Sequence, residues 1–239
     1  MSLQRIDKIL SSQNIATRNE TKNLIRKGLV KVNDLTVRRP DEKYDPEQSE
    51  IVVSGKKLEY KKHLYIIMNK PAGILSASRD SREKTVIDLL SPDLQRDGLF
   101  PAGRLDKDTE GLILITDDGE FAHKMLSPKN HVYKLYEAEC NRELTPGDVR
   151  RFSEGITTGG ISFLPAEMKI TGKNTALVEI CEGKFHQIKK MFQSIGAEVT
   201  HLKRLRIGEF TLDESLSFGE YRELKNEEIK MFLSRKHGI

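Results

Sequence analysis

The sequence predicts an α+β fold with a small N-terminal part and a larger C-terminal part. Strands and helices are expected in an irregular order, and not as a repeating βαβ series. The continuous apolar runs, such as residues 64–68 and 112–115, have the length of buried strands. Hydrophobic residues make up 37% of the 239 residues, which is enough to build a core.

The first part is predicted to begin with two short helices. Residues 3–10 form the first, and its apolar side comprises Leu3, Ile6, Ile9 and Leu10. The second begins at Thr17, which forms a capping box with Glu20, and ends at Gly28.

Short strands are expected to follow these helices. The alternating residues 29–37 surround Asn33-Asp34, which is typical of a hairpin, and residues 51–53 form another strand. The acidic, turn-rich residues 40–50 lie between these strands, so the chain boundary is placed in the charged stretch 59–63. We therefore expect one domain at 1–60 and another at 61–239.

Two helices are predicted in the second domain. Thr145-Pro146 opens one, and Gly155 ends it. The other follows the helical spacing of Ile188, Met191, Phe192 and Ile195, with Gly196 after it.

The charge is clustered, although the net charge is only +4. Residues 1–40 contain nine basic and three acidic residues, a net charge of +6, and residues 184–206 have a net charge of +5. Clustered Lys and Arg favour polyanions, because each neutralised phosphate releases a counterion. Two solvated helix faces would show the same pattern, so charge alone leaves both interpretations open.

Several classes of protein are disfavoured. No apolar run approaches the roughly 20 residues that cross a bilayer, and the charged N-terminus lacks a signal-peptide core, so we expect a cytoplasmic protein. Cys140 and Cys181 are too few for a disulfide framework or a cysteine-rich zinc site and are expected to be buried, inert thiols. We expect no metal and no cofactor.

Residues 103–112, GRLDKDTEGL, place many charged side chains directly before a buried strand. A polar loop of this kind can hold a side chain in a cleft. A salt-bridged structural loop fits the same residues.

This segment and the LILITDDGEF that continues it resemble the signature of the RNA pseudouridine synthases, in the branch typified by the small-ribosomal-subunit enzyme. Three further blocks agree in the family's order, namely Lys70-Pro71-Ala72-Gly73, Lys134-Leu135-Tyr136 and residues 182–192, EGKFHQIKKMF. Residues 1–60 resemble the S4 RNA-binding module. The resemblance implies a catalytic domain with a mixed, mainly antiparallel sheet and a cleft across its middle.

The resemblance implies an isomerisation of uridine, in which C5 replaces N1 as the atom joined to the ribose. Asp106 aligns with the family's catalytic carboxylate, acting as nucleophile or as base, and Asp108 is its rival. Tyr136 would stack on the flipped uracil and take the proton from C5. Lys189 would keep the catalytic carboxylate ionised.

The resemblance also implies residues that bind the substrate. Arg104 would fill the space of the flipped base or hold a phosphate, unless it pairs with an Asp of its loop. Ile188 would wall the base pocket, and Lys70 belongs to the same set. The phosphate contacts of the S4 module are expected from Arg5, Arg18, Lys22, Arg26 and Lys27.

The expected partner is ribosomal RNA, either 16S rRNA or a small-subunit assembly intermediate, bound by a monomer. The sequence of residues 186–192, HQIKKMF, resembles that of the small-subunit enzymes and therefore favours a uridine of 16S rRNA as the target. A 23S rRNA synthase is the alternative within the enzyme class. A non-catalytic RNA-binding ribosome-assembly protein is the alternative outside it.

Overall fold

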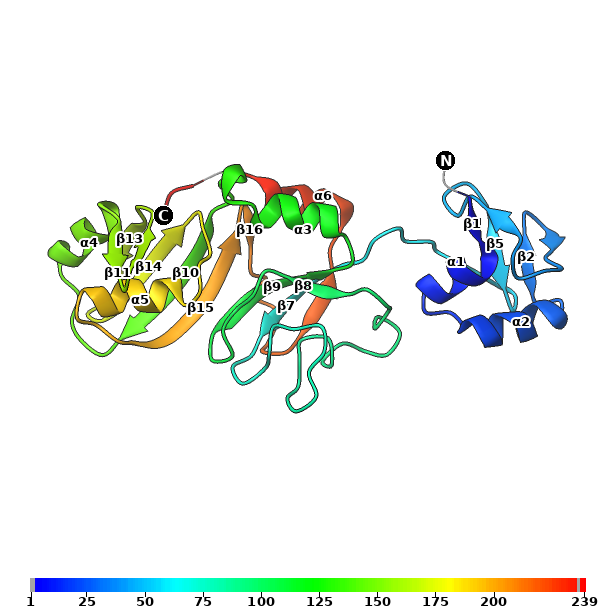
Figure 1. The fold of residues 1–239 in the computed structure, drawn as a ribbon, viewed down its shortest axis with the longest axis horizontal. Coiled ribbons are helices and arrows are strands. Elements are labelled where there is room, and N and C mark those ends of the chain that lie inside the picture. Colours follow the sequence, from blue (N-terminus) through cyan, green and yellow to red (C-terminus); the bar gives the residue numbers. More distant parts are fainter. Residues whose placement is uncertain (1–2, 236) are drawn as a thin grey trace. The chain divides into compact units, whose positions relative to one another are not determined.

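The computed structural model describes residues 3–235 and 237–239, and its contacts divide the chain into two units (Figure 1). The first unit runs to Leu64 and also includes Leu90–Leu99, a segment that the sequence did not assign to it. Asn14 donates to the Pro92 carbonyl at 2.6 Å, and Arg96 donates to the Lys61 carbonyl at 3.0 Å. Segment 90–99 therefore packs with the N-terminal residues, although it lies far from them in the sequence.

The first unit combines two helices with short antiparallel strands. A four-stranded sheet has the order β3-β2-β5-β6, and β1 pairs with β4. The elements are α1 (Ile6–Ser12), α2 (Arg18–Arg26), β1 (Gln4–Arg5), β2 (Val30–Val32), β3 (Leu35–Thr36), β4 (Lys43–Tyr44), β5 (Ile51–Val53) and β6 (Lys56–Lys57). Their common core contains Ile6, Ile9, Leu10, Ile25, Val30, Val32, Val37, Ile51 and Val53.

Local sequence signals explain most of this unit. The capping box of Thr17 and Glu20 is formed in both directions, and the hairpin turns at Asn33 and Asp34, both with positive φ. The prediction for residues 3–10 was wrong at its start, because the chain is still extended at β1, where Arg5 pairs with Lys43. Leu3 consequently lies outside the helix and is 63% exposed.

The second unit is built on a nine-stranded sheet. Its main path is β13-β14-β10-β15-β9-β7-β17, with β16 beside β15 and β8 beside β9. Every pairing is antiparallel except β15 with β9, so the predicted mixed, mainly antiparallel sheet is confirmed. The strands are β7 (Tyr65–Lys70), β8 (Phe100–Ala102), β9 (Glu110–Thr116), β10 (Lys134–Cys140), β13 (Glu167–Ile170), β14 (Thr175–Ile180), β15 (Val199–Ile207), β16 (Phe210–Thr211) and β17 (Tyr221–Glu223).

Helices and a small hairpin complete this unit. The hairpin pairs β11 (Ile156–Thr158) with β12 (Ile161–Phe163). The helical elements are α3 (Gly119–Leu126), η1 (Pro128–Asn130), α4 (Pro146–Ser153), α5 (Gln187–Ser194), α6 (Asn226–Ile229) and η2 (Lys230–Leu233). The predicted start of α4 and the predicted stops of α4 and α5 are confirmed, with Gly155 and Gly196 in the left-handed region after the helices.

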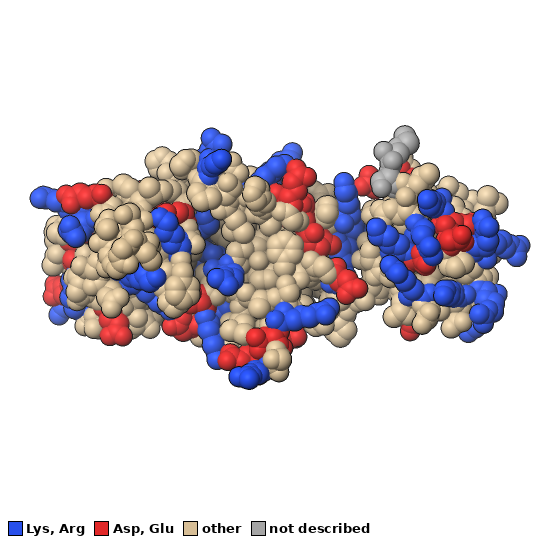
Figure 2. Space-filling model, in the orientation of Figure 1, with Lys and Arg blue, Asp and Glu red and all other residues tan. Residues whose placement is uncertain are grey.

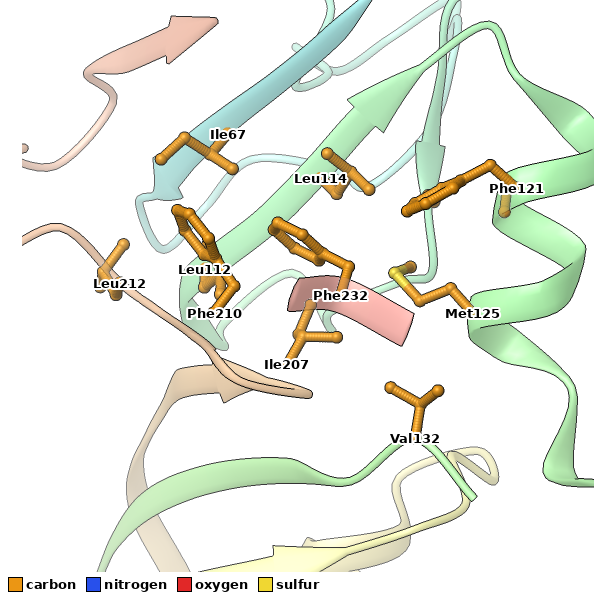
Figure 3. Packing of buried hydrophobic residues seen from close by; sticks show 12 residues of the cluster. Ile67, Leu112, Leu114, Phe121, Met125, Val132, Ile207, Phe210, Leu212 and Phe232 are labelled. Carbon is orange, nitrogen blue, oxygen red and sulfur yellow. The ribbon is translucent and has the colours of Figure 1, made fainter. Parts of the chain in front are cut away.

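The core beside α3 fixes the central strands of the sheet. Leu112 and Leu114 of β9 pack with Phe121 and Met125 of α3 and with Phe232 of η2 (Figure 3). Alternation along β9 turns the neighbouring residues to the other face of the sheet. Ile113 and Ile115 are also fully buried, so the strand that follows the GRLDKDTEGL loop is packed on both faces.

The structure also bears on the predicted burial of the two cysteines and on the presence of membrane-spanning helices. Cys140 is buried as predicted, whereas Cys181 is only half-buried, and burial raises the pKa of its thiol. Among the residues that the structure describes, no helix combines the length and the apolar character that a membrane span requires.

Candidate active site

A hollow lies in the second unit between the 103–110 loop, strands β10 and β15, and the segment that leads into α5. Its narrower part and its wider part share Arg104, Asp106, Tyr136 and His186 among their lining residues. Lys134, Lys184 and Arg204 line its wider part, and Figure 2 shows Lys and Arg side chains on the visible face of this unit. The strands that line it lie in the middle of the sheet, where the cleft was expected.

Lys70 holds the loop that carries Asp106. Its side chain is fully buried, and its ammonium donates to the carbonyls of Pro71, Asp106, Lys107 and Thr109 at 2.9–3.2 Å. Burial lowers the pKa of Lys70 to about 8. Lys70 was predicted to bind the substrate, whereas in this structure its donors face the backbone and its side chain has no exposed surface.

Further contacts fix the same loop. The backbone N–H of Gly73 donates to the Lys107 carbonyl at 2.8 Å. The hydroxyl of Ser76 donates to the Leu105 carbonyl and accepts from the Leu105 N–H. The Lys-Pro-Ala-Gly block and the residues after it thus form a cradle for the Asp106 loop.

Gly111 joins this loop to β15. A Cβ at Gly111 would lie 2.3 Å from the Arg204 carbonyl oxygen, and its φ is +99°. Only glycine allows this close approach without a shift of one strand. The parallel pairing of β9 with β15 therefore brings the Asp106 loop beside Arg204.

Asp106 is one-quarter exposed and lies between two cationic or titratable groups. The Lys189 ammonium is 3.4 Å from Oδ2, and the His186 Nε2 is 3.4 Å from Oδ1. Lys189 makes a shorter contact, 2.6 Å, with Asp108, and this hydrogen bond lowers the pKa of the Asp108 carboxyl. Lys189 is thus shared between both carboxylates, but Asp106 alone of the two lines the hollow.

Tyr136 is brought to the hollow by the alternation of β10. It is 7% exposed, and its cross-strand partner is Arg204 of β15. The Arg204 Nη1 lies 3.5 Å from the Tyr136 hydroxyl oxygen, and the Arg204 Nε donates to the Leu112 carbonyl at 2.7 Å. Tyr133, the nearby alternative, contacts His237 and does not line the hollow.

The remaining predicted residues of this unit also reach the hollow. Ile188 is buried in the first turn of α5 and lines the narrower part of the hollow. Arg104 is exposed at the rim and makes no ion pair within the described part of the chain, so the alternative of an Arg–Asp pair in the loop is not observed. Asp106, Tyr136, Lys189, Arg104 and Ile188 thus meet at one place.

The predicted phosphate contacts of the first unit differ among themselves. Arg18, Lys22 and Arg26 recur every four residues along α2 and are exposed. Lys27 follows them and is also exposed, whereas Arg5 is engaged by Asp7 through two hydrogen bonds of 2.7 and 3.0 Å. Figure 2 shows Lys and Arg side chains gathered on the visible face of this unit.

Sequence reasoning did not identify three residues that line the hollow, namely His186, Lys134 and Arg204. His186 follows directly after the exposed Phe185, on which it stacks at 3.8 Å. Lys134 is the first residue of the recognised Lys-Leu-Tyr block, which could have drawn attention to it. Arg204 depends on the pairing of β10, β15 and β9, which no local motif indicates.

Comparisons with known proteins agree with this geometry. A family model described as RNA pseudouridylate synthase matches residues 64–194, and the S4 domain model matches residues 4–49. The crystal structure of a pseudouridylate synthase superposes with a TM-score of 0.68 at 34% identity, covering 95% of this chain and 99% of the other.

Three curated relatives extend over nearly the whole chain. An uncharacterized RNA pseudouridine synthase, YtzG, of Bacillus subtilis is 42% identical. The match covers 95% of this chain and 97% of YtzG. Ribosomal small subunit pseudouridine synthase A of Vibrio cholerae is 37% identical, and the match covers 94% of this chain and 97% of that protein. Ribosomal large subunit pseudouridine synthase B of Bacillus subtilis is 34% identical, covering 95% of both. The chain therefore belongs to the RNA pseudouridine synthase family, in the branch with an N-terminal S4 domain.

Proposed function

We propose that this enzyme converts one uridine of 16S rRNA to pseudouridine and that Asp106 is its catalytic carboxylate. The observation that carries the assignment is that Asp106 lines both parts of the hollow together with the buried Tyr136. A flipped nucleotide in this hollow would meet a carboxylate at its sugar and a phenol at its base.

In this proposal Lys189 is the counter-ion of the Asp106 carboxylate. A cation within about 4–6 Å of a carboxylate favours its charged form, and Lys189 lies 3.4 Å from Asp106. An ionised carboxylate is required whether Asp106 attacks C1′ of the ribose or removes the proton from C2′. Lys70, which holds the loop backbone, acts as a positioning residue for Asp106.

Tyr136 is proposed to contact the base. Its ring is buried against β15, and its hydroxyl lies beside Arg204, so the phenol is held in one orientation. Stacking on a uracil ring requires only the ring face, whereas uptake of the C5 proton requires the hydroxyl oxygen. Ile188, which is buried and lines the narrower part of the hollow, would exclude water from the base.

The S4 domain is proposed to dock the enzyme on RNA through Arg18, Lys22, Arg26 and Lys27. The first three form one exposed ridge with a spacing of about 6 Å along α2. Such a ridge contributes affinity that depends on salt and carries little sequence information.

The choice of 16S over 23S rRNA rests on the sequence of residues 186–192, His-Gln-Ile-Lys-Lys-Met-Phe. His186 and the exposed Phe185 line the wider part of the hollow, where they would contact nucleotides beside the target. A relative named for the large subunit is almost as similar as the one named for the small subunit, so a 23S rRNA target is the second candidate.

The test is pseudouridine mapping across all rRNA of cells with and without this protein. We expect one 16S rRNA site to disappear with the protein and to return with the wild-type chain, but not with Asp106→Asn. A site lost from 23S rRNA would replace the 16S proposal with the second candidate. If no site changed and the purified enzyme left both rRNAs unmodified, the rRNA proposal would be wrong.

A further inference from the structure

Two buried cations face the wider part of the hollow beside Tyr136. Arg204 is 3% exposed and Lys134 is 5% exposed, and both line the hollow together with Asp106. The Arg204 Nη2 is buried without a hydrogen-bond partner. The hydrogen bond of the Lys134 ammonium, to the Val132 carbonyl at 2.9 Å, leaves further donor capacity.

The charges of this pair are not balanced by the protein. Within the described residues, neither Lys134 nor Arg204 has a carboxylate at ion-pair distance. A buried charge is costly unless a counter-charge accompanies it. Burial, followed by the charge of Arg204, lowers the pKa of Lys134 to about 8. The two residues therefore suit a negative charge that arrives with the substrate or develops on it.

The depth of the pair distinguishes two sources of that charge. Phosphates of an RNA strand remain partly hydrated and can meet exposed cations such as Arg104 at the rim. Arg204, in contrast, lies beneath Tyr136, with its guanidinium carbon 6.0 Å from the ring centroid. The base that Tyr136 contacts is the part of the substrate placed nearest to this pair.

We propose that Lys134 and Arg204 form an anion site for the uracil while it is detached from the ribose. The inference rests on the proposed function. When the C1′–N1 bond breaks, its electron pair leaves with the base and spreads over N1, O2 and O4. Asp106 either forms a bond to C1′ or takes the C2′ proton as a C1′–C2′ double bond forms.

The base then turns, and the same negative charge completes the reaction. Its C5 forms the new bond to C1′ as the Asp106–C1′ bond breaks or, in the other route, as Asp106 returns the proton to C2′ and the C1′–C2′ double bond is lost. C5 then loses its proton and N1 gains one, so that substrate and product are isomers. The cations act on charge that is absent from neutral uridine and present after bond cleavage, and this difference is the requirement for lowering a barrier.

The test compares two target RNAs, transcribed with uridine or with 5-fluorouridine, in single turnover at saturating enzyme. Fluorine at C5 stabilises the base anion by itself, so it should partly replace the help of a cation. We expect Lys134→Met to slow cleavage of the C1′–N1 bond by about 10²-fold with uridine and clearly less with 5-fluorouridine. Arg204→Lys should show a smaller slowing with the same dependence on the base.

The matched control is Lys203→Gln, which removes a cation from β15 whose ammonium lies over Phe218 at 5.3 Å, outside the hollow. Lys203→Gln should change the cleavage rate only slightly, and to the same extent with uridine and with 5-fluorouridine. Methionine at position 134 keeps the volume of lysine without a buried charge, and a melting curve checks the fold.

Several results would overturn the anion site. If Lys134→Met slowed bond cleavage equally in both RNAs, the Lys134 cation would not stabilise negative charge on the base. A weaker affinity and a shallower salt dependence with an unchanged rate would show a phosphate contact instead. If the wild-type enzyme acts on both RNAs, these results overturn the inference alone. If it acts on neither, the proposed function fails and the inference fails with it.

Discussion

The two units place their cations in opposite ways. In the first unit, Lys22 and Arg26 are exposed on α2 and make no ion pair within the described residues. In the second unit, Lys70, Lys134 and Arg204 are nearly or fully buried, and their donors meet carbonyls or the hollow. Exposed cations act over the screening length of the solution, whereas buried cations act on the few atoms beside them.

This contrast separates docking from chemistry. Changes on α2 should alter affinity and its salt dependence, and changes at the hollow should alter the rate at saturation. The predictions below test this separation, beginning with the largest expected effect.

Asp106→Asn should reduce turnover by more than about 10³-fold, which corresponds to about 4 kcal/mol of barrier. The amide keeps the shape of the side chain but loses its charge and nucleophilicity. Single-turnover rates and a binding titration measure the two quantities separately, and RNA affinity should stay within a few-fold of the wild type.

Asp108→Asn is the matched control, because Lys189 contacts both carboxylates. Its side chain is 72% exposed and does not line the hollow. We expect a loss below about 10-fold, as for the removal of a solvent-screened charge. A larger loss from Asp108→Asn than from Asp106→Asn would reverse the assignment of the catalytic carboxylate.

Tyr136→Phe should slow the reaction by about 10²-fold, because the ring remains while the proton acceptor is lost. Affinity for RNA should hardly change, since stacking needs only the ring. A quenched-flow time course at saturating enzyme measures the rate. Tyr133→Phe, outside the hollow, should leave it unchanged. A fully active Tyr136→Phe enzyme would restrict this residue to stacking.

Some of these residues were accessible from the sequence because they belong to local patterns. Thr17 with Glu20 and Asn33 with Asp34 determine their caps and turns through neighbours a few residues away. Asp106 and Tyr136 stand in recognisable blocks. Local patterns of this kind require no knowledge of how the sheet is ordered.

Other features depend on contacts between distant segments. The Asp106 loop meets Lys70 only because β7 and β9 pair, and Arg204 meets Tyr136 only because β15 lies between β9 and β10. Lys70 consequently looked like a substrate contact in the sequence, and Arg204 looked like one member of a basic run. Leu3 was wrongly assigned to the first helix for the same reason. Gln4 and Arg5 pair with β4, so the chain is extended up to Arg5 and the helix begins only after it.

Lys70→Met should lower the stability of the second unit by about 2–4 kcal/mol, because buried carbonyls lose their donor. The loop that carries Asp106 should loosen, so the rate should fall together with the melting temperature. Thermal unfolding and a single-turnover assay check both. Lys129→Met removes an exposed lysine instead and should change neither. A stable but inactive Lys70→Met enzyme would indicate a role beyond positioning.

The two buried lysines also predict a pH dependence of stability. Burial lowers the pKa of Lys134 to about 8, below the ordinary value of 10.5 that the unfolded chain retains. Between these values the unfolded state binds more protons, so this lysine makes the free energy of unfolding rise with pH. Denaturant unfolding at pH 7.5, 8.5 and 9.5 should show a flatter rise for Lys134→Met than for the wild type. Equal slopes in the two proteins would contradict the lowered pKa.

The smallest effect on chemistry is expected from the α2 ridge. The triple variant Arg18→Gln, Lys22→Gln and Arg26→Gln should weaken RNA binding and make the slope of log affinity against log salt shallower. Each lost phosphate contact should contribute about 0.7–0.9 to that slope. The rate at saturating RNA should stay unchanged, because no residue of α2 lines the hollow.

This substitution isolates docking better than deletion of residues 1–60, since segment 90–99 packs with that region and would lose its partners. Arg5→Gln is the control within the same unit. Asp7 already engages Arg5, so its loss should change the salt slope less than the loss of an unpaired cation. An unchanged slope in the triple variant would exclude α2 from the RNA contact. A shallower slope accompanied by a slower rate at saturation would break the separation itself, because exposed cations of the first unit would then influence the chemical step.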